Sequence, residues 1–182
     1  MSVPGIFARA EEAAGFGEEE LKTCMDEFGD MVLRTAYVYL RDRQKAEDVY
    51  QEVFVRVFRH GDKIKRMDNP QGWILRVTMN LCRDLKRSTW WRRVLFLNDE
   101  RDGVSGSLED RIVASEKSRE LLAHIMRLET PYRMAVLLFY YHDLSTREIA
   151  GVLKVPEGTV RSRLHRARAL LKDYMNSGEE SP

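Results

Sequence analysis

The 182-residue chain contains only two cysteines and five prolines, so it has few residues that could cross-link or stiffen the backbone. Cys24 and Cys82 are too few and too far apart for a zinc site or a disulfide framework, and we expect ordinary half-buried thiols. No apolar run approaches the roughly 20 residues that span a bilayer. Residues 1–20 lack the basic segment and apolar core of a signal peptide. The sequence therefore predicts a cytoplasmic protein with no membrane insertion.

Patterns typical of β-structure and of enzyme sites are also absent. No segment alternates apolar and polar residues over the length of a strand, and no hairpin turn joins two such segments. The four histidines are scattered, and the acidic residues show no metal-binding spacing. A nuclease or another nucleic-acid enzyme therefore has no support, and we expect no catalytic residue, cofactor or metal. With 32% charged and 43% hydrophobic residues, the composition is that of a soluble globular protein. Because no strand pattern is present, we expect an all-α fold.

The net charge of +1 conceals a strong segregation of charge along the chain. Residues 1–30 carry −6, residues 31–96 carry +8, residues 97–120 carry −3 and residues 121–182 carry +2. Two positive blocks are thus separated by a negative one. A near-neutral chain with this distribution remains compatible with binding to nucleic acid.

The acidic block contains a linker. Its sequence from Asn98 to Asp110, NDERDGVSGSLED, is rich in glycine, serine and acidic residues. We expect a flexible acidic linker at residues 97–111 between two small helical domains, one over residues 22–96 and one over residues 112–176.

The second domain contains a helix-turn-helix pattern. Ser145 and Glu148 have the spacing of a capping box, which starts a helix at Thr146. Lys154 and the following residues end that helix, and we expect Pro156 at the first position of the next. Apolar residues then recur at spacings of four, three and four, which predicts a buried stripe of Val160, Leu164, Ala167 and Leu171.

The opposite side of this second helix is basic. Ser162, His165 and Arg166 are expected to face outward. The cations that flank them are Arg161, Arg163, Arg168 and Lys172. No acidic residue interrupts the run from Thr159 to Lys172, and such a helix fits the major groove of DNA.

The first domain has apolar stripes at helical spacing. The residues expected on them are Phe28, Val32, Thr35, Ala36 and Tyr39, then Ala46, Val49, Tyr50, Val53 and Val57, then Trp73, Ile74, Val77, Leu81 and Leu85. After His60 and Gly61 we expect a polar loop to Asn69, and Pro70 opens the third helix.

Polar faces accompany these stripes. The second helix carries an acidic and amide surface of Glu47, Asp48, Gln51 and Glu52. The third helix carries a polar stripe of Arg76, Asn80, Arg83 and Arg87, which should face a polyanion. Trp90 and Trp91 follow among cations, and two interpretations stay open: packing against the domain, or stacking on unpaired bases.

Three of these segments together resemble the bacterial RNA polymerase sigma factors of the extracytoplasmic-function (ECF) group. They are AEDVYQEVF at residues 46–54, GWILRVTMN at residues 72–80 and GTVRSRLHRAR at residues 158–168. The segments occur in the family's order, and the resemblance covers roughly residues 22–175.

The resemblance implies a role without catalysis: the protein joins core RNA polymerase, recognises a promoter and helps to separate its strands. Asp48, Gln51 and Glu52 match the family's contact with the polymerase clamp helices. Asn80 matches a position that holds a flipped-out base of the start-proximal promoter element, with residues 62–71 completing the pocket. The expected partners are core polymerase, double- and single-stranded promoter DNA, and an anti-sigma factor that no residue here identifies.

Within the same resemblance, the basic helix matches the family's reader of the promoter element farther upstream. The residues carried over are Thr159, Arg161, Ser162, His165 and Arg166. The main rival hypothesis is a stand-alone helix-turn-helix regulator whose first domain senses a ligand or dimerises. That rival predicts a self-complementary apolar interface. The polar stripe and the acidic surface of the first domain favour the sigma factor instead.

Overall fold

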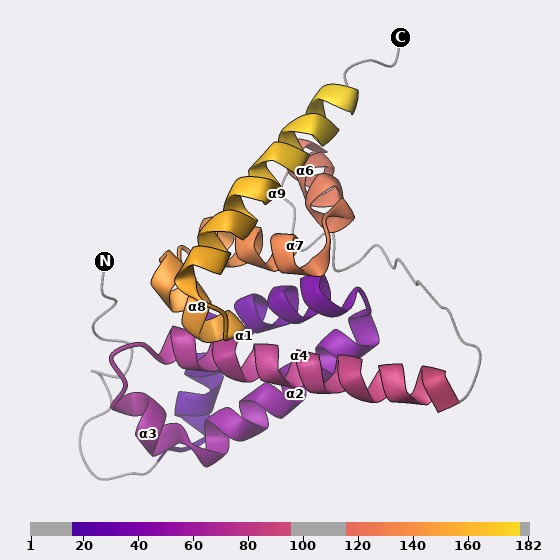
Figure 1. Cartoon of the computed structure of the whole chain (residues 1–182). Coiled ribbons are helices and arrows are strands. Elements are labelled where there is room, and N and C mark those ends of the chain that lie inside the picture. The colour runs from indigo at the N-terminus through magenta and orange to yellow at the C-terminus, as the bar shows by residue number, and fades with distance from the viewer. Residues whose placement is uncertain (1–15, 96–115, 179–182) are drawn as a thin grey trace.

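A computed structural model describes the backbone of residues 16–95 and 116–178, and the side chains of residues 16–88 and 120–176. Its described segments contain helices and no strand, which confirms the predicted all-α fold (Figure 1). The predicted linker, residues 97–111, lies outside the described residues. No helix among the described residues is long and apolar enough to cross a membrane.

The N-terminal half consists of α1 (Glu18–Leu40), α2 (Arg43–Arg59), α3 (Gly61–Lys65) and α4 (Pro70–Leu95). The side chain of Glu20 accepts a hydrogen bond from the Gly17 N–H at 2.9 Å at the start of α1, and Asp42 caps α2 by accepting from the Lys45 N–H at 3.0 Å. Between them Arg41 has a left-handed backbone, with φ 57°, which ends α1. These local signals set α1 and α2 side by side as a helical hairpin.

The region after His60 differs from the predicted loop. Residues 61–65 form the short helix α3, because the fully buried side chain of Ile64 packs in the core and holds this turn against it. Pro70 begins α4 as predicted. Asn69 precedes it, and its side-chain oxygen accepts a hydrogen bond from the Gly72 N–H at 2.7 Å.

The buried face of α4 is also offset from the predicted stripe. Trp73, Val77, Leu81 and Leu85 are only half-buried. The residues that are fully buried are Ile74, Leu75, Thr78, Met79 and Cys82. The reason is that α4 packs against α1 and α2 on one side and against α8 on the other, so its core face is set by contacts remote in sequence.

The C-terminal half consists of α6 (Glu116–Arg127), α7 (Thr130–Val136), the π-helical turn η1 (Leu137–Tyr141), α8 (Thr146–Leu153) and α9 (Glu157–Gly178). The capping box at the start of α8 is confirmed: the Ser145 N–H donates to Glu148 Oε2 at 2.9 Å, and the Glu148 N–H donates to Ser145 Oγ at 3.3 Å. Lys154, with φ 56°, ends α8. The structure starts α9 one residue later than predicted, so Pro156 precedes the helix and its carbonyl accepts from Thr159 and Val160.

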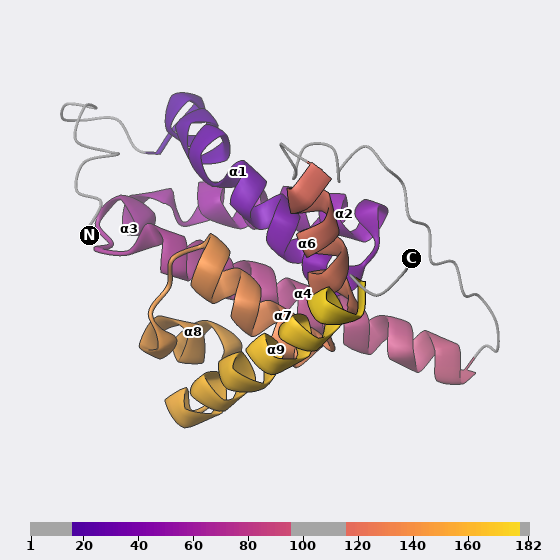
Figure 2. The ribbon, with the colours of Figure 1, turned by 90° about the horizontal axis from the view of Figure 1, so that it is seen from above.

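The two predicted domains pack against each other and share one hydrophobic core. Besides the stripes of α1, α2 and α4, that core includes Met134, Ala135, Leu137, Leu138, Leu144, Ile149, Val152, Leu153, Val160 and Leu164 from the C-terminal half. Across this core α7 packs against α1, and α8 packs against α4 and α9 (Figure 2). A smaller cluster of Leu128, Val136 and Ala167 joins α7 to α9.

Both cysteines lie inside this core. Cys24 and Cys82 are fully buried, so the prediction of half-buried thiols was wrong. Burial raises the pKa of the Cys24 thiol to about 11 and that of Cys82 to about 12. Each thiol therefore stays protonated at neutral pH and acts as a small apolar side chain.

Candidate nucleic-acid interface

The outer face of α9 presents the predicted DNA-reading side chains. Arg161, Ser162, His165 and Arg166 are exposed, whereas Thr159 is half-buried. The opposite face is anchored by Val160, Leu164 and Ala167, each at most 2% exposed. Because the apolar face is fixed in the core, the polar face is held at a defined angle at the surface.

One carboxylate organises the start of α9. Glu157 accepts a hydrogen bond from the Thr146 hydroxyl at 2.6 Å and from Arg161 at 2.7 Å. The bond from Thr146, followed by the one from Arg161, lowers the pKa of Glu157. The first residue of α9 thus ties α8 to α9 and orients Arg161 along the helix surface.

The predicted polar stripe of α4 divides into two pairs. Arg76 and Arg87 are exposed, and Arg87 lies 3.8 Å from Asp84. Asn80 is half-buried and accepts a hydrogen bond from Arg83 at 3.2 Å. The same Arg83 guanidinium donates to the carbonyls of Val152 and Leu153 at 3.2 and 3.0 Å, respectively. Asn80 and Arg83 therefore lie at the junction with α8, and the guanidinium of the exposed Arg76 reaches the same helix beside Gly151.

The segment expected to complete a base pocket also contacts the C-terminal half. Asn69 donates from its side chain to Glu148 at 2.9 Å, and Gln71 donates to the His142 carbonyl at 3.2 Å. Residues 69–71 therefore serve two purposes in this arrangement: they start α4, and they bond to the turn around α8. The side chains of Trp90 and Trp91 lie outside the described residues.

The acidic surface of α2 lies on the side opposite its buried stripe, as predicted. Asp48 and Gln51 are exposed, and Glu52 is half-buried and accepts from Arg56 at 2.8 Å. Val49 and Val53 are buried on the opposite side. A surface of this kind can contact a cationic or amide-rich partner without disturbing the core.

Comparison with known proteins accounts for both halves. The Sigma-70 region 2 family matches residues 24–92, and the Sigma-70, region 4 family matches residues 118–171. The chain is 32% identical to the ECF RNA polymerase sigma factor SigL of Mycobacterium tuberculosis, over 90% of this chain and 93% of SigL. The chain belongs to the ECF RNA polymerase sigma factors.

Two further comparisons fit this membership. The ECF sigma factor SigE of Mycolicibacterium smegmatis is 34% identical over 92% of this chain, which spans 65% of the length of SigE. The fold is similar to that of the sigma factor RpoE from Bartonella quintana, solved with the anti-sigma factor NepR. That similarity has a TM-score of 0.64 at 18% identity and covers 87% of this chain and 98% of RpoE.

Some polar residues that join the halves of this sigma factor were missed by sequence reasoning. Arg133 is 2% exposed, and its guanidinium donates to the carbonyls of Val38 and Leu128 at 2.7 and 2.8 Å. Its position at the head of an apolar run, RMAVLLFYY, was the available signal. A lone cation in such a run must find acceptors when it is buried.

Proposed function

We propose that this sigma factor binds core RNA polymerase, directs it to specific promoters and promotes strand opening, with no catalytic step of its own. The observation that carries the proposal is the anchored, outward-facing set of polar side chains on α9, which belongs to the segment that matches region 4. Arg and short polar side chains on an exposed helix can read base edges in the major groove. We assign the upstream promoter element to this helix.

The polar stripe of α4 is assigned to the start-proximal element. Arg76 and Arg87 are exposed and can meet DNA phosphates in the present arrangement. Asn80 and Arg83 become accessible to DNA only after α8 moves away from α4, because Arg83 is bonded to carbonyls of α8. Promoter opening by this protein therefore includes a separation of the two halves.

The acidic surface of α2 is assigned to core polymerase. Asp48 and Gln51 are exposed on a helix whose other side is buried, so they can be contacted without any rearrangement of the domain. An acidic surface on an otherwise basic half also disfavours DNA at that place, because like charges repel. This separates the polymerase-facing side from the DNA-facing side.

The remaining assignments follow from the family. The Bartonella relative was solved with an anti-sigma factor, and we propose a partner of that kind for this chain as well. Because its proposed partners are core RNA polymerase and promoter DNA, we place the protein in the cytoplasm. We keep the predicted domain bounds, residues 22–96 and 112–176, as the proposed division of the chain.

The decisive experiment is promoter-specific transcription with purified core polymerase. A library of genomic fragments is transcribed with and without the chain, and the start sites are mapped. Transcripts that appear only with the chain support the proposal. Their absence on every fragment, together with tight duplex binding by the chain alone, would favour the stand-alone regulator.

A further inference from the structure

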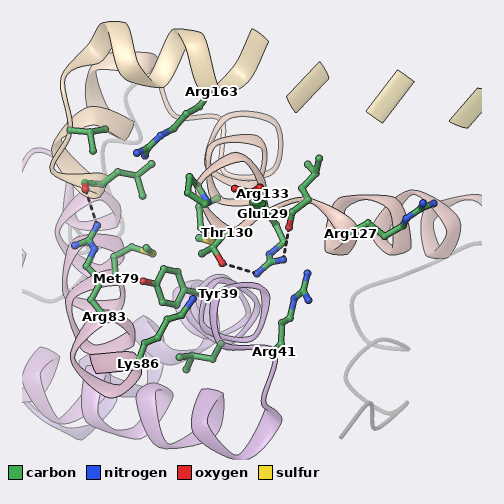
Figure 3. Close-up of a pocket in the computed structure, with 16 residues that line it drawn as sticks. Tyr39, Arg41, Met79, Arg83, Lys86, Arg127, Glu129, Thr130, Arg133 and Arg163 are labelled. Carbon is green, nitrogen blue, oxygen red and sulfur yellow. Dashed lines mark hydrogen bonds between the residues drawn. The ribbon is translucent and has the colours of Figure 1, made fainter. Parts of the chain in front are cut away.

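A cationic cleft opens between the two halves of the molecule. It has a volume of about 860 Å³ and is lined by the end of α1, by α4, by the turn between α6 and α7, by α7 itself, and by α8 and α9 (Figure 3). Volumes of this size are typical of sites for small molecules. The cleft is distinct from the exposed face of α9 that we assign to promoter DNA.

The lining of this cleft is strongly positive. Its cations are Arg41, Arg83, Lys86, Arg127, Arg133 and Arg163, and its single carboxylate is Glu129. Figure 3 shows Arg41, Lys86 and Arg163 directed toward the cleft from three different elements, whereas Arg127 points away from it. None of the six forms an ion pair with a carboxylate of the described residues. Arg127 stacks on the ring of Tyr174 instead. Without it, five cations and one carboxylate leave a surplus of four positive charges.

The burial of Arg133 makes this surplus of positive charge unfavourable for the folded state. Its guanidinium donates only to neutral acceptors: the carbonyls of Val38, Leu128 and Met126, and the hydroxyl of Thr130. Burial, and then the charge of Arg41, lowers the pKa of Arg133 to about 10. Two like charges held together without a counter-charge disfavour the folded state. An anion in the cleft would offset that cost.

We propose that the cleft is a binding site for a compact polyanion of the polyphosphate class. Arginine forks bind phosphate oxygens in pairs, and a lysine adds a point charge. Several phosphate groups on one small molecule match a surplus of four charges in this volume better than a single carboxylate does. The wall also includes Tyr39, Leu40 and Met79, which suits a phosphate chain that carries an organic group.

Binding in this cleft has a structural consequence. A polyanion between Lys86 on α4 and Arg163 on α9 links the two halves across the cleft. It stabilises the arrangement in which Arg83 is bonded to α8 and is unavailable to DNA. The ligand therefore opposes the separation that promoter opening includes. Binding itself can be measured without polymerase or promoter. The binding test can therefore fail without any consequence for the proposed function, and the reverse also holds.

The test is isothermal titration calorimetry of the full chain with sodium tripolyphosphate, ATP and orthophosphate as separate probes. We expect tripolyphosphate to bind one site and orthophosphate to bind at least about tenfold more weakly, because it has fewer charges. Tighter binding of ATP than of tripolyphosphate would assign the site to a nucleotide, and the reverse would assign it to an inorganic polyphosphate. Saturating probe should also raise the unfolding temperature of the chain.

A double variant locates the site. Lys86→Ala with Arg163→Ala should lower tripolyphosphate affinity on the order of tenfold or more, with helical circular dichroism unchanged. The matched control, Lys63→Ala with Arg147→Ala, removes the same charge from exposed positions outside the cleft and should keep the affinity within about twofold. A second comparison, Arg161→Ala with Arg166→Ala, tests whether the probe binds the outer face of α9.

Four outcomes would overturn the proposal. They are the absence of tripolyphosphate binding to the wild-type chain, an equal loss of affinity in the matched control, an equal loss in the α9 double variant, and tighter binding of an oligoglutamate peptide than of either phosphate probe. The last outcome would assign the cleft to an acidic protein segment.

Discussion

The Thr35 hydroxyl on α1 and His142 Nε2 at the end of η1 lie 2.9 Å apart inside the junction between the two halves. Thr35 is fully buried and His142 is 7% exposed. Burial, and then the charge of Arg34, lowers the pKa of His142 to about 4. The imidazole is therefore neutral in the folded protein, and this hydrogen bond joins helices more than a hundred residues apart in sequence.

This pair makes the stability of the fold depend on pH. The unfolded state takes up a proton on His142 below pH 6.5, whereas the folded state does so only near pH 4. The free energy of unfolding is thus highest above pH 6.5. It falls as the pH drops toward 4, by about 1 kcal/mol at pH 5.5. Urea unfolding of the wild type and of His142→Gln between pH 7.5 and 5.5 measures this difference. Parallel curves for the two proteins would contradict it.

A second prediction concerns Arg133, whose side chain joins α7 to the end of α1. Arg133→Met should lower the free energy of unfolding by about 3 kcal/mol, because it leaves the buried carbonyls of Val38 and Leu128 without a donor. Arg133→Lys should not restore stability, since one ammonium group cannot replace a guanidinium fork. Arg147→Ala, at an exposed position, serves as the control and should change stability by less than about 0.5 kcal/mol. Urea denaturation checks all three.

The features predicted correctly from sequence are those fixed by local chemistry. The capping box of Ser145 and Glu148 needs only three residues of spacing, and the buried stripe through Val160 and Leu164 needs only helical periodicity. The all-α fold and the exposed basic face of α9 follow from the same kind of pattern.

The features that sequence reasoning missed depend on partners remote in the chain. The core face of α4 centres on Leu75 and Met79 because α8 covers a side that the periodicity assigned to solvent. The turn at residues 61–65 becomes helical because Ile64 finds a place in the core of the whole molecule. The bonds of Arg83 to α8 could not be predicted either, since no spacing within α4 indicates what packs over it.

The two cysteines give a third prediction, on chemical reactivity. With both thiols fully buried and their pKa values raised to about 11 and about 12, the native protein should not react with a disulfide reagent at pH 8. In concentrated denaturant both should react within the mixing time. Absorbance of the released thiolate counts the reacting groups, and fast reaction of one thiol in the native protein would show that its helix opens locally.

A fourth prediction concerns promoter recognition by α9. Arg166→Ala should cost about 1–3 kcal/mol on the preferred upstream element and relax specificity at one base position, if this exposed side chain makes a base contact. Lys172→Ala, six residues farther along α9, should weaken binding to all sequences alike and lower its salt dependence. Competition binding of holoenzyme to single-base promoter variants distinguishes the two. Uniform weakening by Arg166→Ala would assign it to a phosphate.

The two roles proposed for α4 can be separated with two arginines that lie about two helical turns apart on the same stripe. Arg76 is exposed, whereas Arg83 donates to two carbonyls at the end of α8. Both Arg76→Ala and Arg83→Ala should reduce promoter opening on the order of tenfold, because each removes a cation from the DNA-facing stripe. Permanganate reactivity of thymines in the opened strands measures that effect.

Only Arg83→Ala should also destabilise the protein on its own, by about 1–2 kcal/mol, because it removes charged donors from the α8 carbonyls. Arg76→Ala should leave the free energy of unfolding within about 0.5 kcal/mol of the wild type. Urea unfolding of the isolated chain measures this second effect. Equal stability of the two variants would mean that the bonds of Arg83 to Val152 and Leu153 do not hold the halves together in solution. A loss of stability without any loss of opening would assign Arg83 to the junction alone and remove it from the DNA-binding stripe.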